Sequence, residues 1–568
     1  MRIPVALSLL GLLPAFAIAE TTESLASRFP AGAIAYVEVH GLAGAVDALL
    51  DSPLGKKARE NPLAAAFWEG PQGRKLATAE SVLKTLTGYD LRGALRAFAG
   101  RELALAAYPG PKGPPTYVVA TRLSPEAAPK AQAFLAAAGL FARAQAPPEE
   151  GRPLLFDFGG SLFSFVDGDL WVSGTDRARV VALRDGGGEM LGASEWFAGA
   201  RGLLDAGVDA FALLDLRPFA EKLRAGAKAK DLGQALFLGA LPAYLPDAPY
   251  AALALTARGG ALDVAARIPA PKGVPAEVAT CFGGELAPLP FALPERTVAL
   301  LRFRRDLRAI WEHRDALLAE AGVAQTIEFE TNFGTLTAGM SFVDDFLPRL
   351  GPEVTILATR AEYAAGVPAP SVRLPQFALL FPMKDAETMW PELRQAFLQT
   401  MSLVNLGAMQ SQGRAFRIGA ETHKGVEIQT ATYRPPEPAE MEGQTGLPIR
   451  YNFSPSAAMV HGCFVIGSTT GIVREIVDAQ GRPGTPAQGV NAGFWIEGRD
   501  SAQLLRENRE AFVSQAMLEE GKPRATAEMQ LDLALEIARH VLAASLVVEE
   551  GRDAVGLRLH VAFDAQGN

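Results

Sequence analysis

The feature that most constrains the fold of this chain is an internal repeat that runs through nearly all of its 568 residues. The segment AIAYVEV (33–39) recurs as TVALLRF (297–303), so that Ile34 corresponds to Val298. Self-similarity in a fixed order outranks any local motif, because each copy is expected to build the same set of elements. The two halves are therefore expected to match element by element.

Further matches follow in the same order along both halves. They are LRAFAGRELALA (95–106) with FLPRLGPEVTIL (346–357), PTYVVA (115–120) with PQFALL (375–380), KAQAFLAA (130–137) with LRQAFLQT (393–400), FVDGDLWVSGTD (165–176) with MVHGCFVIGSTT (459–470), AFALLDLR (210–217) with AGFWIEGR (492–499) and ALDVAARI (261–268) with AVGLRLHV (554–561). They pair Gly100 with Gly351, Glu102 with Glu353, Phe134 with Phe397, Gly168 with Gly462 and Arg217 with Arg499. Insertions fall between the matched elements, where surface loops tolerate them. The order predicts a tandem duplication.

The pattern inside each copy predicts the fold class. Apolar runs joined by short turns alternate with amphipathic helical stretches, which favours an α+β fold of two tandem copies of a mostly antiparallel sheet module with helices packed on one face. The expected domains are a first module over residues 20–268, a Pro-rich connector over 269–294 and a second module over 295–568. Whether two such sheets pack side by side or face each other stays open.

The N-terminus predicts export. Met1, Arg2 and Ile3 precede an apolar stretch that ends in Ala17-Ile18-Ala19 before Glu20, the order of a signal peptide with cleavage after Ala19. An uncleaved anchor is the alternative, although the stretch is shorter than the ~20 apolar residues of a spanning helix. Later stretches are too short or too charged to span a bilayer, so we expect a periplasmic or extracellular protein.

Composition narrows the partners. The net charge of -9 is modest for this length, and no run of like charges occurs, so neither nucleic acid nor an anionic membrane surface is an expected partner. The hydrophobic share of 49% indicates a well-buried globular chain. The two cysteines, Cys281 and Cys463, do not occupy equivalent places in the repeat, and whether they pair stays open.

Catalytic and metal motifs are missing from the sequence. It contains no phosphate-binding loop of the P-loop type, no nucleophile elbow, no H-E-x-x-H and no C-x-x-C. His313-Arg314-Asp315 lies in helical pattern and lacks the downstream Asn of a kinase loop. Gly467-Ser468-Thr469-Thr470-Gly471 could cradle a phosphate, but a strand end followed by a helix cap explains it and its counterpart at 173–177.

A few polar pairs are weaker candidates. His461 and Cys463 stand two apart on a hairpin, yet two ligands without a third make no zinc site, and their counterparts Asp167 and Asp169 indicate turn chemistry. Paired acids for general acid-base catalysis occur at Asp344 with Asp345, Glu328 with Glu330, and Glu549 with Glu550, although solvated faces explain such pairs better. The sequence thus predicts no catalytic, cofactor-binding or metal-binding residue.

Two differences between the copies are more informative. Only the second copy carries the Pro- and Glu-rich segment from Pro435 to Pro448, which could bind a partner or act as a spacer. Phe397, Met401 and Met409 lie on a helical stretch more apolar than its counterpart, and they could form core or line a site for an apolar ligand.

The export signal, the FAGRELALA and RLGPEVTIL units and the duplicated hairpin together resemble a family of uncharacterised, duplicated bacterial envelope proteins, known as a domain of unknown function. The resemblance implies no activity, cofactor or site residue.

Three functional classes remain. The leading hypothesis is an exported protein that binds or scaffolds an envelope protein without catalysis. The second is a periplasmic carrier of lipid or another apolar ligand, because helices that cover a sheet can enclose a cavity. The third is a hydrolase with dispersed carboxylates, which would need a cleft holding two acids in different environments.

Overall fold

A computed structural model gives the structure of the chain. It describes residues 24–52, 55–56, 59, 69–110, 113–138, 143–144, 152–273, 276–337, 339–363, 368–411, 413–436, 446–479 and 489–564. The predicted signal peptide, Met1 to Ala19, and most of the Pro-rich segment, residues 437–445, lie outside the described residues.

The chain forms two compact units, and both are discontinuous in sequence. Unit 1 comprises Met1–Glu221, Asp247–Ala270 and Arg552–Asn568, and unit 2 comprises Lys222–Pro246 and Pro271–Gly551. Each unit therefore contains a segment from the other half of the sequence. No helix among the described residues combines the length and apolar character that a membrane span requires.

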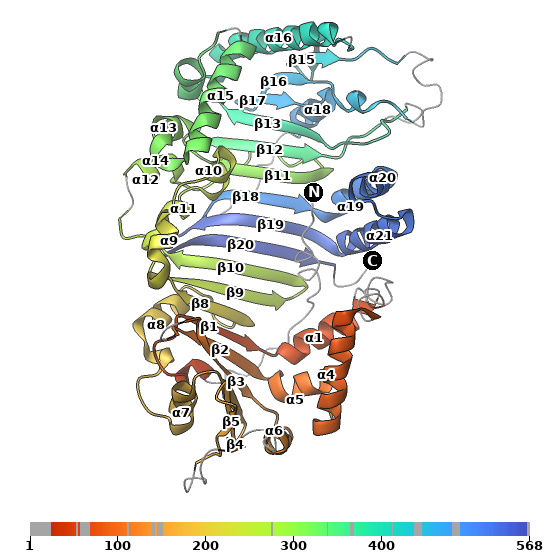
Figure 1. The fold of residues 1–568 in the computed structure, drawn as a ribbon. Coiled ribbons are helices and arrows are strands. Elements are labelled where there is room, and N and C mark those ends of the chain that lie inside the picture. The colour runs from red at the N-terminus through yellow and green to blue at the C-terminus, as the bar shows by residue number, and fades with distance from the viewer. Residues whose placement is uncertain are drawn as a thin grey trace. The chain divides into compact units, whose positions relative to one another are not determined.

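The strands of unit 1 form an antiparallel sheet (Figure 1). Across the sheet they follow the order β20 (Ala554–Phe563), β10 (Ala261–Pro269), β9 (Tyr250–Arg258), β8 (Ala210–Asp215), β1 (Ala35–His40), β2 (Glu102–Tyr108), β3 (Thr116–Arg122), β7 (Leu170–Gly174), β6 (Leu162–Asp167), β5 (Phe156–Phe158) and β4 (Arg143–Ala144).

Helices cover both faces of this sheet. The helices of unit 1 are α1 (Leu42–Asp51), α4 (Pro71–Thr87), α5 (Leu91–Ala99), α6 (Ala128–Ala138), α7 (Arg177–Asp185) and α8 (Glu195–Gly202), besides α9 (Ala220–Arg224), which crosses the unit boundary, and short 3-10 turns at Leu25–Ser27, Leu191–Ala193 and Arg217–Phe219. Val172 on β7 belongs to the core cluster of α7 and α8, whereas its neighbour Trp171 packs with α5 and α6. Successive strand residues point to opposite faces, so the two clusters lie on opposite sides of the sheet.

Unit 2 has an antiparallel sheet of the same kind. Its order is β19 (Val541–Glu550), β18 (Val490–Glu497), β11 (Thr297–Arg304), β12 (Glu353–Thr359), β13 (Gln376–Pro382), β17 (Cys463–Gly467), β16 (Ser456–Val460), β15 (Val426–Thr432) and β14 (Arg417–His423).

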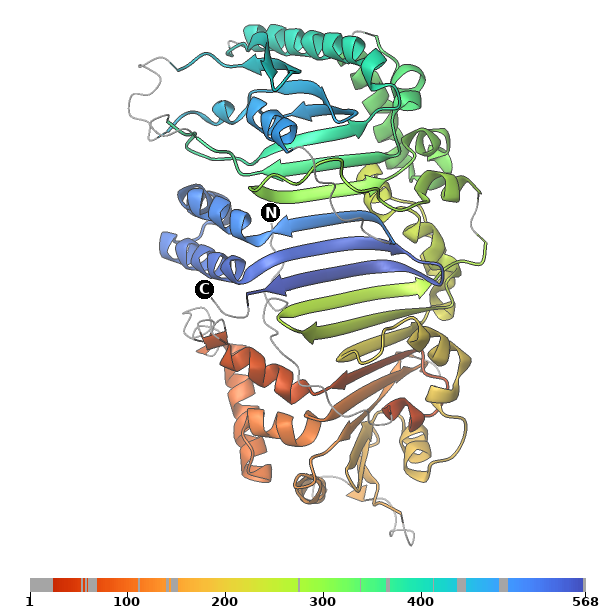
Figure 2. The ribbon, with the colours of Figure 1, turned by 180° about the vertical axis from the view of Figure 1, so that it is seen from behind.

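The helices of unit 2 also lie on two faces, as Figure 2 lets the reader follow from behind. They are α10 (Leu232–Leu238), α11 (Leu241–Tyr244), α12 (Ala276–Phe282), α13 (Leu307–Glu312), α14 (Arg314–Leu317), α15 (Glu320–Leu336), the π-helical turn η6 (Phe342–Phe346), α16 (Ala386–Gln410), α18 (Thr470–Asp478), α19 (Gly498–Glu507), α20 (Arg509–Glu520) and α21 (Arg524–His540), with 3-10 turns at Leu245–Asp247, Leu347–Arg349 and Ile449–Asn452. Phe464 packs with α13, η6 and α16, and its neighbour Val465 packs with α18.

The predicted fold class is therefore wrong in two respects. The expected modules would each keep their own sheet, but β20, from the end of the chain, pairs with β10 of unit 1 from Ala261↔Ala562 to Pro269↔Ala554. The last strand of the second expected module therefore belongs to unit 1. The helices cover two faces and not one, because β16 and β17 bury successive residues on both sides.

The order of strands nonetheless repeats. The series β9-β8-β1-β2-β3-β7-β6-β5-β4 of unit 1 recurs in unit 2 as β19-β18-β11-β12-β13-β17-β16-β15-β14, and the register recurs with it. For example, Ala35 faces Ala107 and Leu214 in unit 1, and Ala299 faces Ala358 and Ile496 in unit 2. This recurrence supports the proposed duplication.

One predicted correspondence is displaced by one residue. The hairpin of unit 1 closes at Asp167↔Leu170 and that of unit 2 at Val460↔Cys463, so Gly168 corresponds to His461 and not to Gly462. Both occupy a positive φ, 57° at Gly168 and 52° at His461. Unit 2 also has a positive φ of 74° at Gly462, and the match of one glycine with the other shifted the sequence alignment by one residue.

A buried arginine holds α10, which comes from the first half of the sequence, within unit 2. Arg305 is 1% exposed, and its guanidinium donates to the last carbonyls of α10, 2.8 Å to Leu236 and 3.0 Å to Phe237. Burial lowers its pKa to about 10, so the group stays charged at neutral pH. These bonds cap the helix end, whose carbonyls have no partner inside the helix.

The pairing of β20 with β10 gives a first prediction. A Cβ atom at Gly556 would overlap the carbonyl oxygen of Ala266 on β10, so Gly556→Ala should lower the free energy of unfolding by about 1–3 kcal/mol. Gly44→Ala in α1, where a Cβ meets nothing within 4 Å, is the matched control and should be neutral or slightly stabilising. Urea denaturation of the full chain measures both. Equal stability of the two variants would contradict the close strand pairing.

Candidate functional site

One candidate site is an apolar cavity inside unit 2. It has a volume of about 500 Å³ and lies between the sheet and the layer formed by α13, α15, η6 and α16. This volume falls in the range of small-molecule sites, roughly 300–1,000 Å³. The lining residues are Leu232, Leu236, Phe303, Leu307, Trp311, Phe329, Phe333, Thr337, Met340, Phe342, Phe346, Leu350, Val354, Ile356, Leu379, Phe381, Leu393, Ala396, Phe397, Thr400, Met401, Pro455, Phe464 and Ile466.

An aromatic cluster forms the wall opposite the sheet. The ring of Phe342 lies 4.9 Å from Trp311, 4.8 Å from Phe329 and 5.0 Å from Phe333, each in an edge-to-face arrangement. Such pairs contribute about 0.5–1.5 kcal/mol each beyond the area they bury. Phe329 and Phe333 stand four apart on α15, which places both rings on one face of the helix.

Few polar groups reach the cavity, and these groups already form hydrogen bonds within the protein. The indole Nε1 of Trp311 donates to Glu330 at 2.6 Å. The hydroxyls of Thr337 and Thr400 donate to helix carbonyls, Thr337 to Phe333 at 2.7 Å and Thr400 to Ala396 at 2.8 Å. The described lining contains no ionisable side chain. The cavity therefore fits an uncharged, apolar molecule or the acyl part of an amphiphile.

The corresponding face of unit 1 is packed differently. The hairpin correspondence places Trp171 where unit 2 has Phe464. The Trp171 ring lies 5.6 Å from Phe98 and 6.1 Å from Phe134, the counterpart of Phe397. The larger indole fills space at the position where the smaller phenyl ring of Phe464 borders a cavity.

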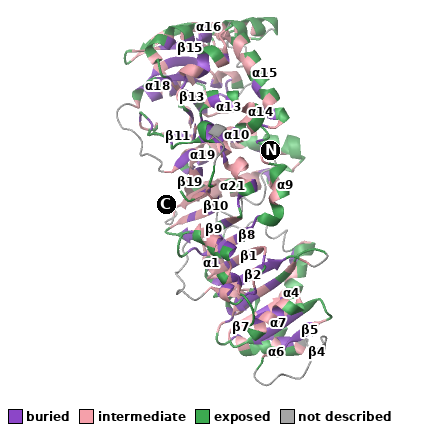
Figure 3. Ribbon diagram, turned by 90° about the vertical axis from the view of Figure 1, so that its left-hand side faces the viewer, coloured by how far each residue is buried: buried purple, intermediate pink, exposed green. Residues whose placement is uncertain are grey.

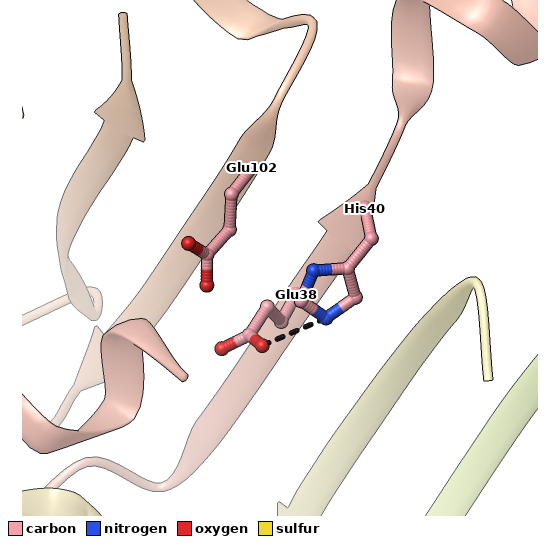
Figure 4. A group of neighbouring side chains, drawn as sticks. All are labelled: Glu38, His40 and Glu102. Atoms are coloured by element: carbon pink, nitrogen blue, oxygen red, sulfur yellow. Dashed lines mark ion pairs between the residues drawn. The ribbon is translucent and has the colours of Figure 1, made fainter. Parts of the chain in front are cut away.

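A second candidate is a polar cluster on β1 and β2 of unit 1. Figure 4 shows Glu38, His40 and Glu102 turned toward one another, with their ligand-type atoms all within 4.8 Å. Glu38 and Glu102 are each 1% exposed. Two carboxylates and an imidazole are a plausible donor set for a divalent cation, so their existing partners decide whether the cluster fits one.

Hydrogen bonds already satisfy both carboxylates. Glu38 accepts from the hydroxyl of Tyr36, from Ser24 Oγ at 2.6 Å and from His40 Nε2 at 2.9 Å. Glu102 accepts from Arg122 Nε at 2.6 Å and from the amide of Leu25 at 3.1 Å. A cation would have to displace these donors and lie beside the Arg122 guanidinium, so the cluster fits a structural network better than a metal centre.

The repeat supports a structural role for the cluster. The register that places His40 opposite Glu102 places Arg304 opposite Glu353, and Arg302 takes the position of Glu38. Glu353 accepts from Arg302 at 3.0 Å and from Arg304 at 3.3 Å. Both units thus bury an ionic network at the same strand positions, with different residues.

The pKa shifts in the unit 1 cluster follow from these bonds. The hydrogen bond to Glu38 raises the pKa of His40, and burial opposes that shift. Burial acts to raise the pKa of Glu38, but hydrogen bonds from His40, Ser24 and Tyr36 outweigh it and lower that pKa. Burial raises the pKa of Glu102.

The residues singled out in the sequence are not brought together as a catalytic site. Glu328, Asp344 and Asp345 are exposed, and Glu330 is half-buried against Trp311 and Arg314. His313 ends α13, and the exposed Asp315 lies in α14. Glu549 and Glu550 end β19, and burial raises the pKa of Glu550. These positions give no support to the hydrolase hypothesis.

The remaining candidates have local roles. Thr469 caps α18 by accepting from the amide of Ile472 at 3.2 Å, so this turn is occupied by a helix cap. The exposed His461 stacks on Phe291, whereas Cys463 is buried and burial raises its pKa to about 11. Cys281 and Cys463 are both buried and form no disulfide.

The sequence did indicate part of the cavity. Phe397 and Met401 line it, whereas Met409 is 70% exposed. The aromatic wall was not predicted from the sequence. A signal was present, because Phe329 with Phe333 and Phe342 with Phe346 repeat a four-residue step that is typical of one apolar helix face.

Comparisons with known proteins add little to this geometry. No protein-family model matches the chain, and no curated protein matches it. The structure of crystal form III of TP0453 is similar to 46% of this chain and 85% of its own, with a TM-score of 0.25 and 7% sequence identity. That likeness is too low to carry an argument, and the resemblance to an envelope protein family stays a prediction.

The raised pKa of His40 gives a second prediction. Because the folded state raises the pKa of His40, the protonated imidazole stabilises the fold. This stabilisation is fully present below the pKa of the unfolded state and is lost as the pH rises through the pKa of the folded state. His40→Gln should therefore cost about 1–2 kcal/mol of unfolding free energy near pH 5 and less near pH 9.

The matched control is Arg304→Gln at the equivalent position of unit 2. Arginine carries its charge at every pH at which proteins fold, so the cost of this variant should not change between pH 5 and pH 9. Urea denaturation across pH measures both variants. A pH-independent cost for His40→Gln would rule out the proposed ionic bond between His40 and Glu38.

Proposed function

We propose that this chain is an exported, non-catalytic binding protein that holds an apolar molecule or an acyl chain inside unit 2. The observation that carries the proposal is the cavity of about 500 Å³ without an ionisable lining residue. Apolar ligands bind such cavities because their surface leaves water, at roughly 25 cal/mol per Å². The proposal combines the binding and carrier hypotheses and makes a scaffolding role unnecessary.

The lining also favours binding over catalysis. General acid-base or nucleophilic catalysis needs a proton donor, base or nucleophile within hydrogen-bond reach of the substrate. The only hydroxyls in the described lining, on Thr337 and Thr400, donate to helix carbonyls. Export rests on the predicted signal peptide, Met1 to Ala19, and would place the protein in the periplasm or outside the cell.

Filling the cavity gives a third prediction. Ala396 lines the cavity from α16 and is 7% exposed, so the ring introduced by Ala396→Phe would occupy ligand space. We expect binding of the uncharged fluorescent probe N-phenyl-1-naphthylamine to weaken at least about tenfold, equivalent to about 1.4 kcal/mol. In the wild-type chain, palmitic acid should displace the probe.

The control places the same phenylalanine at the exposed neighbour Gln395, where it adds apolar surface outside the cavity. Gln395→Phe should bind the probe as the wild type does, and circular dichroism checks that both variants fold. Unchanged probe affinity in a folded Ala396→Phe variant would overturn the proposal. So would a wild-type chain that binds neither probe nor palmitic acid.

A further inference from the structure

An exposed apolar surface lies on the two helices that border the cavity. We define the apolar face by the exposed large side chains of α15 and α16, which are Ile327, Phe329, Leu336, Leu403, Val404, Leu406 and Met409. The two helices meet where Thr400 Oγ1 donates to the carbonyl of Leu336 at 2.9 Å. Figure 3 marks exposed residues on both α15 and α16.

Most of the apolar face lies on segments that carry no charge, whereas Ile327 and Phe329 flank the exposed Glu328. No Asp, Glu, Lys or Arg occurs at residues 331–343, which end α15 and lead into η6, or at residues 395–413, which contain the second half of α16. Leu406 is 53% exposed and Met409 is 70% exposed. Leu403, Val404, Leu406 and Met409 point in different directions around the helix, because each residue advances it by ~100°. This end of α16 therefore exposes apolar side chains in several directions, with the uncharged Ser402 and Gln410 between them.

The apolar face is continuous with the cavity. Phe329 both lines the cavity and is 44% exposed, and Thr400 and Met401 line the cavity one turn before the exposed Leu403 and Val404. An acyl chain that leaves the cavity past these residues would emerge at the apolar face. Arg417, which is exposed, follows Phe416, whose backbone is held by the side chain of Asn405 on α16.

We propose that the apolar face inserts into the surface of a lipid bilayer, from which the cavity takes up its acyl ligand. The uptake step rests on the proposed function, whereas insertion can be tested alone. A bilayer suits a helix end that is apolar in several directions, because lipid surrounds an inserted side chain on every side. A protein partner would instead match one face of the helix. The nearby Arg417 suits phosphate groups at the interface.

The mode of insertion follows from the charges. The chain has a net charge of -9 and the apolar face has none, so attachment depends on buried apolar area and not on attraction to anionic lipid. Binding to zwitterionic phosphatidylcholine vesicles should therefore be nearly the same at about 0.1 M and about 0.5 M salt, because salt screens charges and leaves hydrophobic insertion in place.

Flotation of the full chain with phosphatidylcholine vesicles tests the proposal. The double variant Leu406→Glu with Met409→Glu should reduce the vesicle-bound fraction about tenfold or more, because each carboxylate must be dehydrated on insertion. The control is Leu518→Glu on α20, a leucine that is 86% exposed and lies outside the apolar face. It should bind vesicles as the wild type does.

The outcomes separate insertion from ligand binding. Ala396→Phe should still bind vesicles while it loses the probe, and the Leu406→Glu, Met409→Glu variant should keep the probe in solution while it loses vesicles. Vesicle binding that survives the double variant, or a wild-type chain that does not float, overturns insertion and leaves the cavity intact as a site. A wild-type dimer that the double variant dissociates would assign the face to a second copy and also overturn the proposal.

Discussion

The cavity of unit 2 depends on the aromatic contacts around Phe342. This ring joins Trp311 on α13 to Phe329 and Phe333 on α15, with centroid distances of 4.8–5.0 Å. Because the rings pack mainly against one another, they form a wall, and a cavity lies between this wall and the sheet. Protein interiors are normally packed too densely to leave such space. A bound ligand would account for an apolar cavity of this size.

The two units show how one strand framework can carry different sites. At equivalent strand positions unit 1 has Glu38, His40 and Glu102, and unit 2 has Arg302, Arg304 and Glu353, so the ionic network is kept while its charges change. The apolar residues between the sheet and its helices differ between the units in size and not in charge. Unit 1 places Trp171 where unit 2 has Phe464, and α6 is a helix of 11 residues where α16 has 25. The longer helix supplies Phe397 and Met401 to the cavity, and the exposed apolar residues beyond them.

Sequence comparison predicted the elements far better than their assembly. Glu102 and Glu353 were paired correctly as the first residues of β2 and β12, because each begins an alternating apolar run that only one register can bury. The pairing of β20 with β10 could not be predicted, since hydrogen bonds between distant strands leave no local pattern. The cavity was foreseen only at Phe397 and Met401. Its other residues come from several segments, and a void depends on how their rings pack, which one-dimensional spacing does not encode.

The central claim is that an acyl chain lies inside unit 2, and the most direct test is a crystal structure of the full chain grown with 12-bromododecanoic acid. Bromine scatters anomalously, so its position can be found without interpreting weak density for the chain. The account predicts an anomalous peak within the cavity, between Phe342 and Ala396, which both line it. Bromine found only at the protein surface, with Phe342 and its neighbours closed over the cavity, would contradict the account.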